Sequence, residues 1–310
     1  MSHPQLIIHI GFPKAASSWL QQVIFNDEKL GFFSPWGLES AEAIEQFVIP
    51  DSFHFSAEST FKVFEPGLQE AASRGMVPII SHECLVGNQM AGTYYGKEAA
   101  DRIHNVFPEA RILILLREQK SMVLSSYRQY IKSGGMKTIE DFMGATQRRP
   151  GFAPPCQLTY LEYDLLIAYY QKLFGVDNVL VLPFELLKEK QQFLCQKVLS
   201  FAGLDGTPEY QQESKNVGFR GLTMEFRRKL NSVVKRPDFG NVQGSRSLAW
   251  RIAEKLSKIL DRFVPQSIHK QIEDPLKQSI AETIGDSFRK SNQKTSQLIG
   301  MNLADFGYDS

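Results

Sequence analysis

Short apolar runs alternate with helical patterns through residues 5–205, and this alternation limits the possible folds more than any other feature. Four runs have the length and composition of buried strands: 5–10, 77–81, 110–116 and 178–184. They are nearly uncharged, as expected for strands covered on both faces. The helical patterns lie near 17–29, 39–48, 57–74, 94–106, 119–133, 158–174 and 190–203. We therefore predict an α/β fold of three layers, with a central parallel sheet and right-handed crossovers.

The pattern changes after residue 205, where no further strand is evident. Residues 215–270 hold 13 Lys and Arg against 4 Asp and Glu, although the formal net charge of the whole chain is only +1. No linker rich in Pro, Gly or Ser separates this part from the rest. We expect a single domain over 1–310, in which 205–310 form a helical extension.

Composition excludes several functional classes. Hydrophobic residues make up 43% of the 310, enough for a sizeable core, and the near-neutral charge argues against a nucleic-acid binder. The cysteines Cys84, Cys156 and Cys195 are far apart, which suggests neither a metal site nor a disulfide framework. The N-terminal residues do not resemble a signal peptide, and no apolar run is long enough to span a membrane. We expect a soluble cytoplasmic protein with no metal.

A strand-to-helix joint at residues 6–25, LIIHIGFPKAASSWLQQVIF, has the features of a phosphate-binding loop. Ser17 and Ser18 suit the start of a helix. Their hydroxyls and the backbone amides of residues 15–18 would converge on one anion, which the helix dipole also stabilises. Lys14 would add a mobile positive charge over the same anion.

The loop is not a Walker A motif. That motif, G-x-x-x-x-G-K-[ST], places its lysine directly before the hydroxyl, whereas Ala15 and Ala16 separate Lys14 from Ser17 here. The alternative is that this segment is a strand–turn–helix connection with an exposed lysine and no ligand.

A second strand-to-helix joint lies at 110–133, ARILILLREQKSMVLSSYRQYIKSGG. Arg117 follows the strand directly, at the end where ligands bind in open α/β sheets. Ser125 comes eight residues later and could share an anion with the guanidinium, whose planar fork suits phosphate oxygens. The structural alternative is an ion pair between Arg117 and Glu118 or Glu109.

Together the two joints resemble the nucleotide site of sulfotransferases that use 3′-phosphoadenosine 5′-phosphosulfate (PAPS). The 5′-phosphosulfate loop of that family reads roughly P-K-x-G-[ST]-[ST], and the matching residues are Pro13, Lys14, Ser17, Ser18, Trp19 and Leu20. The family's 3′-phosphate segment is matched by Arg117, Ser125 and Tyr127. The resemblance implies that the 5′ end of the nucleotide is bound by Lys14, Ala15, Ala16, Ser17, Ser18 and Trp19, and the 3′-phosphate by Arg117 and Ser125.

Ala16 departs from this pattern, because the family usually has glycine there. If the position needs a positive φ, alanine carries a strain of about 1 kcal/mol. If glycine serves only for close approach, alanine is tolerable.

Two further segments are similar to the family at lower specificity. In 178–204, Glu185 and Leu186 fall at a turn that we interpret as structural. In 214–221, SKNVGFRG, the resemblance implies a loop that closes over the nucleotide, with Arg220 as its first candidate contact and Lys215 as its second. A solvated connector is the alternative for that loop.

The strand at 77–81 ends in His82 and Glu83, where related sulfotransferases commonly carry a catalytic histidine or glutamate. Adjacent strand residues face opposite ways, so only one of the pair is expected to face the acceptor. We favour Glu83 as the base, with His82 as the runner-up; a surface pair that caps the next helix is the alternative. His9 is predicted to be a core histidine with one hydrogen bond.

The resemblance implies transfer of the sulfuryl group from PAPS to a hydroxyl or amine of a glycan, a glycolipid or a small molecule, leaving PAP as product. Lys14 would stabilise the leaving phosphate, and Glu83 or His82 would act as base. Two other functions stay open: a P-loop nucleotide kinase or NTPase, and a catalytically silent PAP-binding protein of the same fold.

The predicted helix at 246–264 is amphipathic and basic. Such a helix can lie on an anionic membrane surface, and more often it covers the protein's own core. The sequence leaves peripheral membrane contact open, and it does not indicate the oligomeric state.

Overall fold

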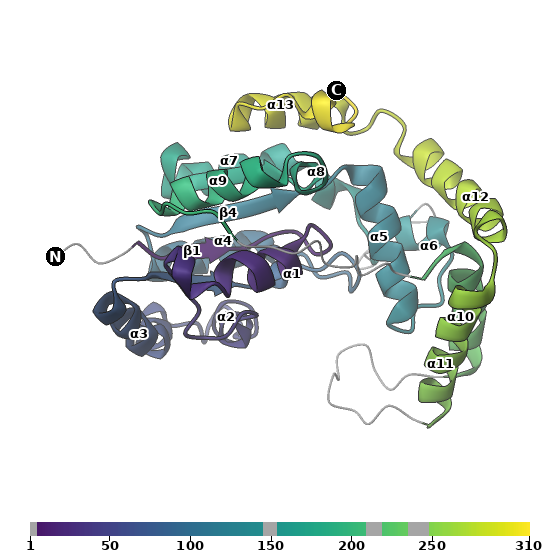
Figure 1. The fold of residues 1–310 in the computed structure, drawn as a ribbon, viewed down its shortest axis with the longest axis horizontal. Coiled ribbons are helices and arrows are strands. Elements are labelled where there is room, and N and C mark those ends of the chain that lie inside the picture. The colour runs from purple at the N-terminus through teal and green to yellow at the C-terminus, as the bar shows by residue number, and fades with distance from the viewer. Residues whose placement is uncertain (1–4, 145–153, 209–218, 235–247) are drawn as a thin grey trace.

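The computed structural model describes residues 5–144, 154–208, 219–234 and 248–310. Its centre is one parallel sheet of five strands in the order β2-β3-β1-β4-β5 (Figure 1). The register aligns Ile8 with Ile80 on one side and with Ile112 on the other. The strands are β1 (Ile7–His9), β2 (Phe32–Phe33), β3 (Val77–Ser81), β4 (Arg111–Leu116) and β5 (Val179–Pro183). The four predicted strands and the predicted fold class are confirmed.

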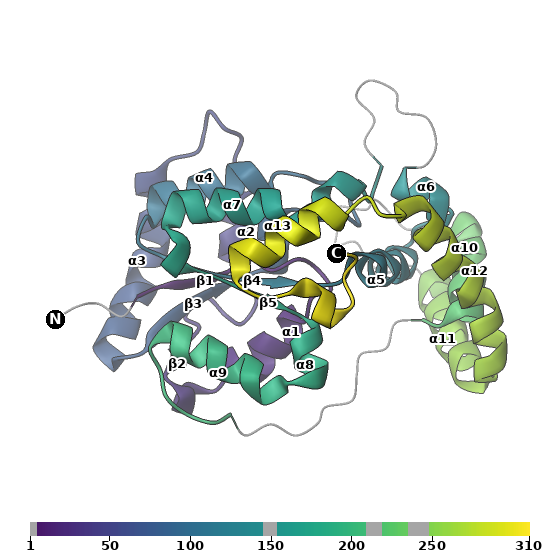
Figure 2. The same ribbon diagram turned by 90° about the horizontal axis from the view of Figure 1, so that it is seen from above.

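The central strands are buried because helices cover both of their faces. All of β3 is buried, and Ile112 to Leu116 of β4 have no exposed surface. Figure 2 shows α4 and α7 on one side of the sheet and α1 and α9 on the other. This double cover explains why the strands are continuous apolar runs rather than alternating ones.

Strand β2 was not predicted. It contains only two residues and pairs with Val77 and Pro78 at the edge of the sheet, where Val77 N–H donates at 2.8 Å to the carbonyl of Gly31, the residue before β2. A strand this short has no periodicity that a sequence window could detect.

The helices of the α/β part agree with the predicted ranges at their centres and differ mainly at their ends, except that α6 and α8 were not predicted. They are α1 (Ser17–Trp19), α2 (Ala41–Phe47), α3 (Ala57–Arg74), α4 (Gly96–Val106), α5 (Gln119–Lys132), α6 (Ile139–Met143), α7 (Tyr163–Phe174), α8 (Glu185–Glu189) and α9 (Gln191–Ala202). The first predicted helix is divided, because α1 continues directly as a π-helix, η1 (Leu20–Phe25). Further single turns are η2 (Glu28–Leu30), η3 (Glu83–Val86), η4 (Leu158–Leu161), η5 (Val176–Asn178) and η6 (Leu303–Phe306).

The C-terminal part is helical, as predicted. Its helices are α10 (Gly221–Val233), α11 (Leu248–Phe263), α12 (Gln266–Ile284) and α13 (Arg289–Ile299). Figures 1 and 2 show α10, α11 and α12 beyond α5, away from the sheet, whereas α13 returns to pack over α7. We call α10, α11 and α12 the helical arm. Lys215 and the first two residues of the predicted helix 246–264 lie outside the described residues.

The described helices include none with the length and apolar character needed to cross a membrane.

Candidate functional site

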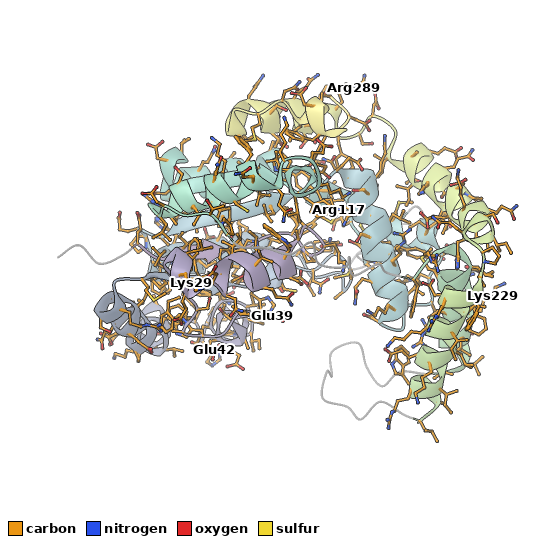
Figure 3. The ribbon with its side chains drawn as sticks, in the orientation of Figure 1. Lys29, Glu39, Glu42, Arg117, Lys229 and Arg289 are labelled. Atoms are coloured by element: carbon orange, nitrogen blue, oxygen red, sulfur yellow. The ribbon has the colours of Figure 1, made fainter. Side chains whose placement is uncertain are left out.

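Three loops meet at the carboxyl edge of the sheet. They follow β1, β3 and β4 and carry Lys14, Glu83 and Arg117, respectively. Because these strands are adjacent and parallel, their ends open on one side of the molecule, next to the start of α1 and α5 (Figure 1). Figure 3 shows Arg117 where the sheet meets α5. The fold therefore brings together the two joints that the sequence singled out.

The loop after β1 turns through two left-handed residues. Lys14 has φ 74° and Ala16 has φ 69°, and they are the positive-φ residues other than glycine among those described. Ala16 is the N-cap of α1 and provides no side-chain cap. The position at which the family usually has glycine thus adopts the left-handed conformation that glycine favours. Ala16 therefore carries the strain that we expected for a positive φ at this position.

This loop offers several hydrogen-bond donors at the start of α1. Ala15 N–H is engaged by Phe12 O at 3.1 Å. In the described structure no hydrogen bond is formed by the amides of Ala16, Ser17 and Ser18. The Ser17 hydroxyl is buried and has no partner at hydrogen-bond distance within the described ranges, although it lies close enough to the Glu83 carboxyl to lower the pKa of that group. A buried hydroxyl without a partner costs free energy, which an oxyanion in this loop would recover.

Gly11 allows this loop to pack closely against the His9 ring. A Cβ atom at Gly11 would lie 2.6 Å from His9 Nε2 and 3.3 Å from Ser17 Oγ. Any other residue there would collide with the His9 ring and crowd the Ser17 hydroxyl. The donors and this close approach fit a phosphate or a sulfated phosphate.

Arg117 reaches the same loop from the other joint. Its Nη1 donates to Lys14 O at 2.8 Å, and its Nε donates to Ser121 Oγ at 3.0 Å. Glu118 does not pair with it, because both Glu118 carboxylate oxygens accept backbone N–H groups of α5. The ion pair considered as an alternative is therefore absent, and across the described ranges neither Arg117 nor Lys14 forms a salt bridge.

Three distant residues hold the β4–α5 joint in place. Tyr163 OH donates to Arg117 O at 2.6 Å. Glu185 Oε1 accepts Glu118 N–H at 3.1 Å, and Glu185 Oε2 accepts Tyr308 OH at 3.1 Å. Sequence reasoning assigned Glu185 a structural role but missed Tyr163 and Tyr308. No local pattern could have found them, because they reach the joint only through the tertiary fold.

Ser125 lies on α5 two turns beyond Arg117 and is partly buried. It makes no hydrogen bond with another described side chain. Tyr127, which matches the family segment, is buried and donates through its hydroxyl to Lys137 O at 3.0 Å. Tyr127 therefore supports the chain after α5, while Ser125 remains available to a ligand.

Glu83 and His82 point to different neighbours. His82 Nδ1 accepts Cys84 N–H at 3.1 Å, and His82 Nε2 lies 3.7 Å from Glu39 Oε1. Burial raises the pKa of the Glu83 carboxyl, and the nearby Lys14 ammonium partly opposes this. Burial lowers the pKa of His82, which Glu39 partly opposes. Glu83 is thus the member of the pair that shares its surroundings with Lys14.

His9 is the core histidine that the sequence predicted. It is fully buried, and its Nδ1 lies 2.9 Å from Ser81 Oγ, which also accepts Gln21 Nε2 at 3.0 Å. Burial, helped by the charge of His82, lowers the pKa of His9 to about 3. The ring is therefore neutral at physiological pH.

Arg220 begins the helical arm and is engaged within it. Its backbone N–H donates to Asp261 Oδ1 at 2.9 Å, and its Nε lies 3.3 Å from Asp261 Oδ2. Its Nη2 also donates to the Asp261 carbonyl. Arg220 would have to leave this ion pair to contact a nucleotide.

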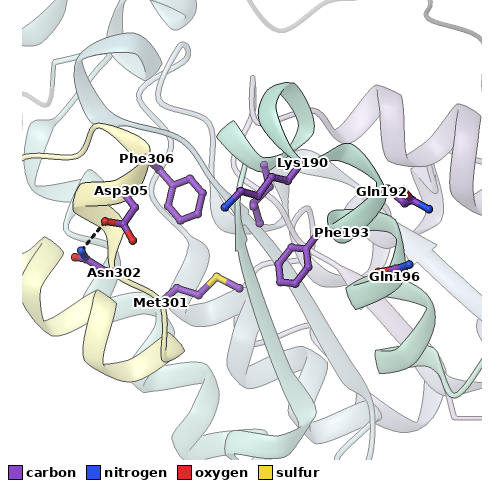
Figure 4. A pocket seen from close by; sticks show the side chains of 9 residues that line it. Lys190, Gln192, Phe193, Gln196, Met301, Asn302, Asp305 and Phe306 are labelled. Atoms are coloured by element: carbon purple, nitrogen blue, oxygen red, sulfur yellow. Dashed lines mark hydrogen bonds between the residues drawn. The ribbon is translucent and has the colours of Figure 1, made fainter.

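A separate hollow of about 590 Å³ lies between α9 and η6 (Figure 4). Phe193, Met301 and Phe306 line it, and at its rim Asn302 Nδ2 donates to Asp305 Oδ1 at 2.8 Å. It contains none of the site residues described above. Within the described ranges, no three His, Cys, Asp or Glu side chains gather as a metal site would require.

Comparison with solved structures shows the fold. A sulfotransferase from Alicyclobacillus acidocaldarius matches with a TM-score of 0.59 and 14% identity, over 99% of this chain and 100% of that one. A sulfotransferase domain from the curacin biosynthetic pathway covers 91% of this chain and 97% of its own at 14% identity, with a TM-score of 0.39. Mouse sulfotransferase SULT7A1 complexed with PAP matches over 94% of this chain and 89% of its own, at 14% identity and with a TM-score of 0.36.

The latter two superpose too loosely to support an argument. No family model and no curated protein sequence matches this chain. The first comparison extends over nearly the whole of both chains, and on that ground this chain has the fold of a sulfotransferase.

Proposed function

We propose that this protein is a sulfotransferase that takes a sulfuryl group from PAPS and transfers it to a hydroxyl or amine of an acceptor. One observation carries the proposal. Lys14 and Arg117, two partly buried cations without salt bridges in the described structure, are joined by the 2.8 Å hydrogen bond from Arg117 Nη1 to Lys14 O. The Glu83 carboxyl lies near Lys14 and the Glu185 carboxyl near Arg117, but neither forms a salt bridge with them in the described structure. Two partly buried cations at one strand edge, neither in an ion pair, favour an anionic ligand with two charged ends.

The residues of the site fit such a nucleotide. The amides of Ala16, Ser17 and Ser18, with Ser17 Oγ and Lys14, would hold the 5′ end, and Ala15 and Trp19 complete this loop. Arg117 and Ser125 would hold the 3′-phosphate. Arg117 would approach this phosphate from the end of β4, and Ser125 from α5. PAPS supplies a sulfuryl group bonded to a phosphate oxygen.

Side chains of this protein could stabilise the charge that develops on the leaving phosphate and accept the proton of the acceptor hydroxyl. Lys14 places a positive charge beside the oxygen that becomes negative, which lowers the barrier in a partly buried site. Glu83 accepts the proton of the acceptor hydroxyl, because burial raises its pKa and makes it a better base than an exposed glutamate. His82, whose ring faces Cys84 and Glu39, is the second candidate for this role.

Ligand-dependent stability and transfer together test this function. PAP should raise the melting temperature more than ATP or GTP at equal concentration, and radiolabelled sulfate should pass from PAPS to a mixture of glycans, glycolipids and phenols. Arg117→Ala should lose the PAP effect, whereas Arg289→Ala, an exposed arginine on α13, should keep it (Figure 3). Magnesium-dependent ATP turnover would instead indicate a kinase or NTPase, and PAP binding without transfer to any acceptor would indicate a silent protein.

A further inference from the structure

Arg227 of α10 is a buried cation that the proposed reaction does not use. Its side chain is 1% exposed, and its Cζ lies 4.0 Å from the centre of the Trp250 ring on α11. Its Nε and Nη1 make no hydrogen bond within the described part of the chain. Stacking on an indole leaves the edge of a guanidinium free for planar hydrogen bonding. A buried guanidinium with two unused donors needs an explanation.

Arg227 lines a pocket of about 210 Å³ between α5, α10 and α11. Its Nε and Nη1 have almost no accessible surface, so a ligand in the pocket would meet the charge of the guanidinium rather than these two donors. Several waters would fill the pocket, and so would one sulfate or carboxylate group. Its lining residues are Gln129, Lys132, Ser133, Phe219, Arg227, Trp250 and Glu254. Two cations thus face one carboxylate, and that carboxylate also pairs with Lys258 at 3.1 Å. The balance of charge in the pocket favours an anion.

Lys132 connects this pocket to the nucleotide edge. It is exposed at the end of α5 and forms no salt bridge with the described residues. After burial and Glu83, the charges of Lys132 and Arg117 are the next influences on the pKa of the Lys14 ammonium, and both lower it. Lys132 therefore lies within electrostatic range of Lys14 while it lines the pocket.

We propose that the pocket between α5, α10 and α11 is an anion-binding site that receives a compact oxyanion group, sulfate or carboxylate, through Arg227 and Lys132. Its use rests on the proposed function: the group would be carried by the acceptor, which would bind with its charged substituent in the helical arm and its reacting hydroxyl near Lys14. The protein would thus prefer acceptors that are already anionic.

The test uses the full-length protein and inorganic sulfate at constant ionic strength, with and without saturating PAP. Binding is followed by the indole N–H signal of Trp250 in ¹H–¹⁵N spectra, which a Trp250→Phe variant assigns among the three tryptophans. Sulfate should shift this signal in both conditions. Lys132→Ala and Arg227→Met should each weaken sulfate binding by about tenfold or more, as expected for a lost charge-assisted contact.

Lys229→Ala is the matched control, since Lys229 is an exposed cation on the same helix and does not line the pocket (Figure 3). It should leave sulfate affinity unchanged. Lys132 is on the surface, so Lys132→Ala tests the proposal even if Arg227→Met does not fold. Sulfate affinity that is indifferent to Lys132 would overturn the site, and so would complete displacement of sulfate by PAP. Failure of PAP to bind would contradict the proposed function and leave the sulfate result to be judged separately.

Discussion

The carboxyl edge of the sheet and the helical arm treat positive charge in opposite ways. The arm and its flanking loops carry most of the excess Lys and Arg of the sequence. Among the described cations there, Arg220 pairs with Asp261, Arg228 with Glu225 and Lys277 with Glu273, and several others are exposed. At the sheet edge, by contrast, Lys14 and Arg117 have no salt bridge in the described structure. A count of charges along the sequence would therefore place an anion-binding site in the arm. Partly buried cations without a salt bridge place it instead at the carboxyl edge of the sheet.

The difference has a simple physical origin. Helices of the arm place acids and bases one turn apart, where pairing on the surface is easy and contributes little to stability. The strand ends place Lys14 and Arg117 among backbone groups. The nearby Glu83 and Glu185 carboxylates influence their pKa values without forming a salt bridge in the described structure. Among the described cations of the arm, those that form no salt bridge but are exposed are Arg251, Lys255, Arg262 and Lys270. Arg227 also forms none, but it is buried and lines a pocket.

Removing the charge of Lys14 should have the largest effect. Lys14→Ala should lower the rate of sulfuryl transfer by about 100-fold or more, because an electrostatic contact to the developing charge is lost, while PAP binding persists in part. Lys29→Ala, which removes an exposed lysine from η2, should not change the rate (Figure 3). Equal loss in both variants would show that the sheet edge is no different from the rest of the surface.

Glu83 should give the next largest effect. Glu83→Gln should reduce transfer by about 100-fold at neutral pH, since the acceptor proton then has no base. In the wild type the rate should fall as the pH drops through the raised pKa of Glu83, because protonation removes the base. If the pH dependence of the transfer rate were unchanged in Glu83→Gln but altered in His82→Gln, His82 and not Glu83 would be the base.

The neutral state of His9 predicts a smaller effect, on stability. The folded ring titrates at about 3 and the unfolded ring at 6.5, so the unfolded chain binds more protons between these values. Stability is therefore complete above pH 6.5 and falls as the pH drops below it, by up to about 1.4 kcal/mol per pH unit. Urea unfolding between pH 7 and 5 should show a steeper fall for wild type than for His9→Gln.

The left-handed residue Ala16 predicts the smallest effect. Ala16→Gly should raise the free energy of unfolding by up to about 1 kcal/mol, because glycine adopts positive φ without strain. Ala15→Gly should destabilise the protein instead, since Ala15 is fully buried and is not in the left-handed region. Thermal unfolding of the two variants measures this contrast, and a lower melting temperature for Ala16→Gly would contradict the assigned strain.

Local sequence was sufficient for most of the fold, and it directed attention to Lys14 and Arg117, whose roles stay predictions. Strands at 77–81 and 110–116 were recognisable because burial on both faces makes them continuously apolar. Lys14 and Arg117 were found because each directly follows or nearly follows such a strand. Phe32–Phe33 was missed because two residues have no period, and the contacts of Tyr308 and Arg227 were missed because they depend on how distant helices pack.

The assignment of Glu83 needs both the strand pattern in the sequence and the side-chain contacts in the fold. Alternation along a strand indicated that one of His82 and Glu83 would face the acceptor, but not which one. The fold separates them: His82 turns to Cys84 N–H and Glu39, and Glu83 shares its surroundings with Lys14. The sequence had no means to show this, because Glu39 belongs to another loop.

The central claim is that Lys14 and Arg117 hold the two ends of one adenosine bisphosphate. Calorimetric titration of wild type and Arg117→Ala with PAP and with adenosine 5′-monophosphate, which lacks the 3′-phosphate, tests it directly. We predict that wild type prefers PAP by about 30-fold, equivalent to about 2 kcal/mol for a charge pair, and that Arg117→Ala loses this preference. An undiminished preference for PAP in Arg117→Ala would contradict the account.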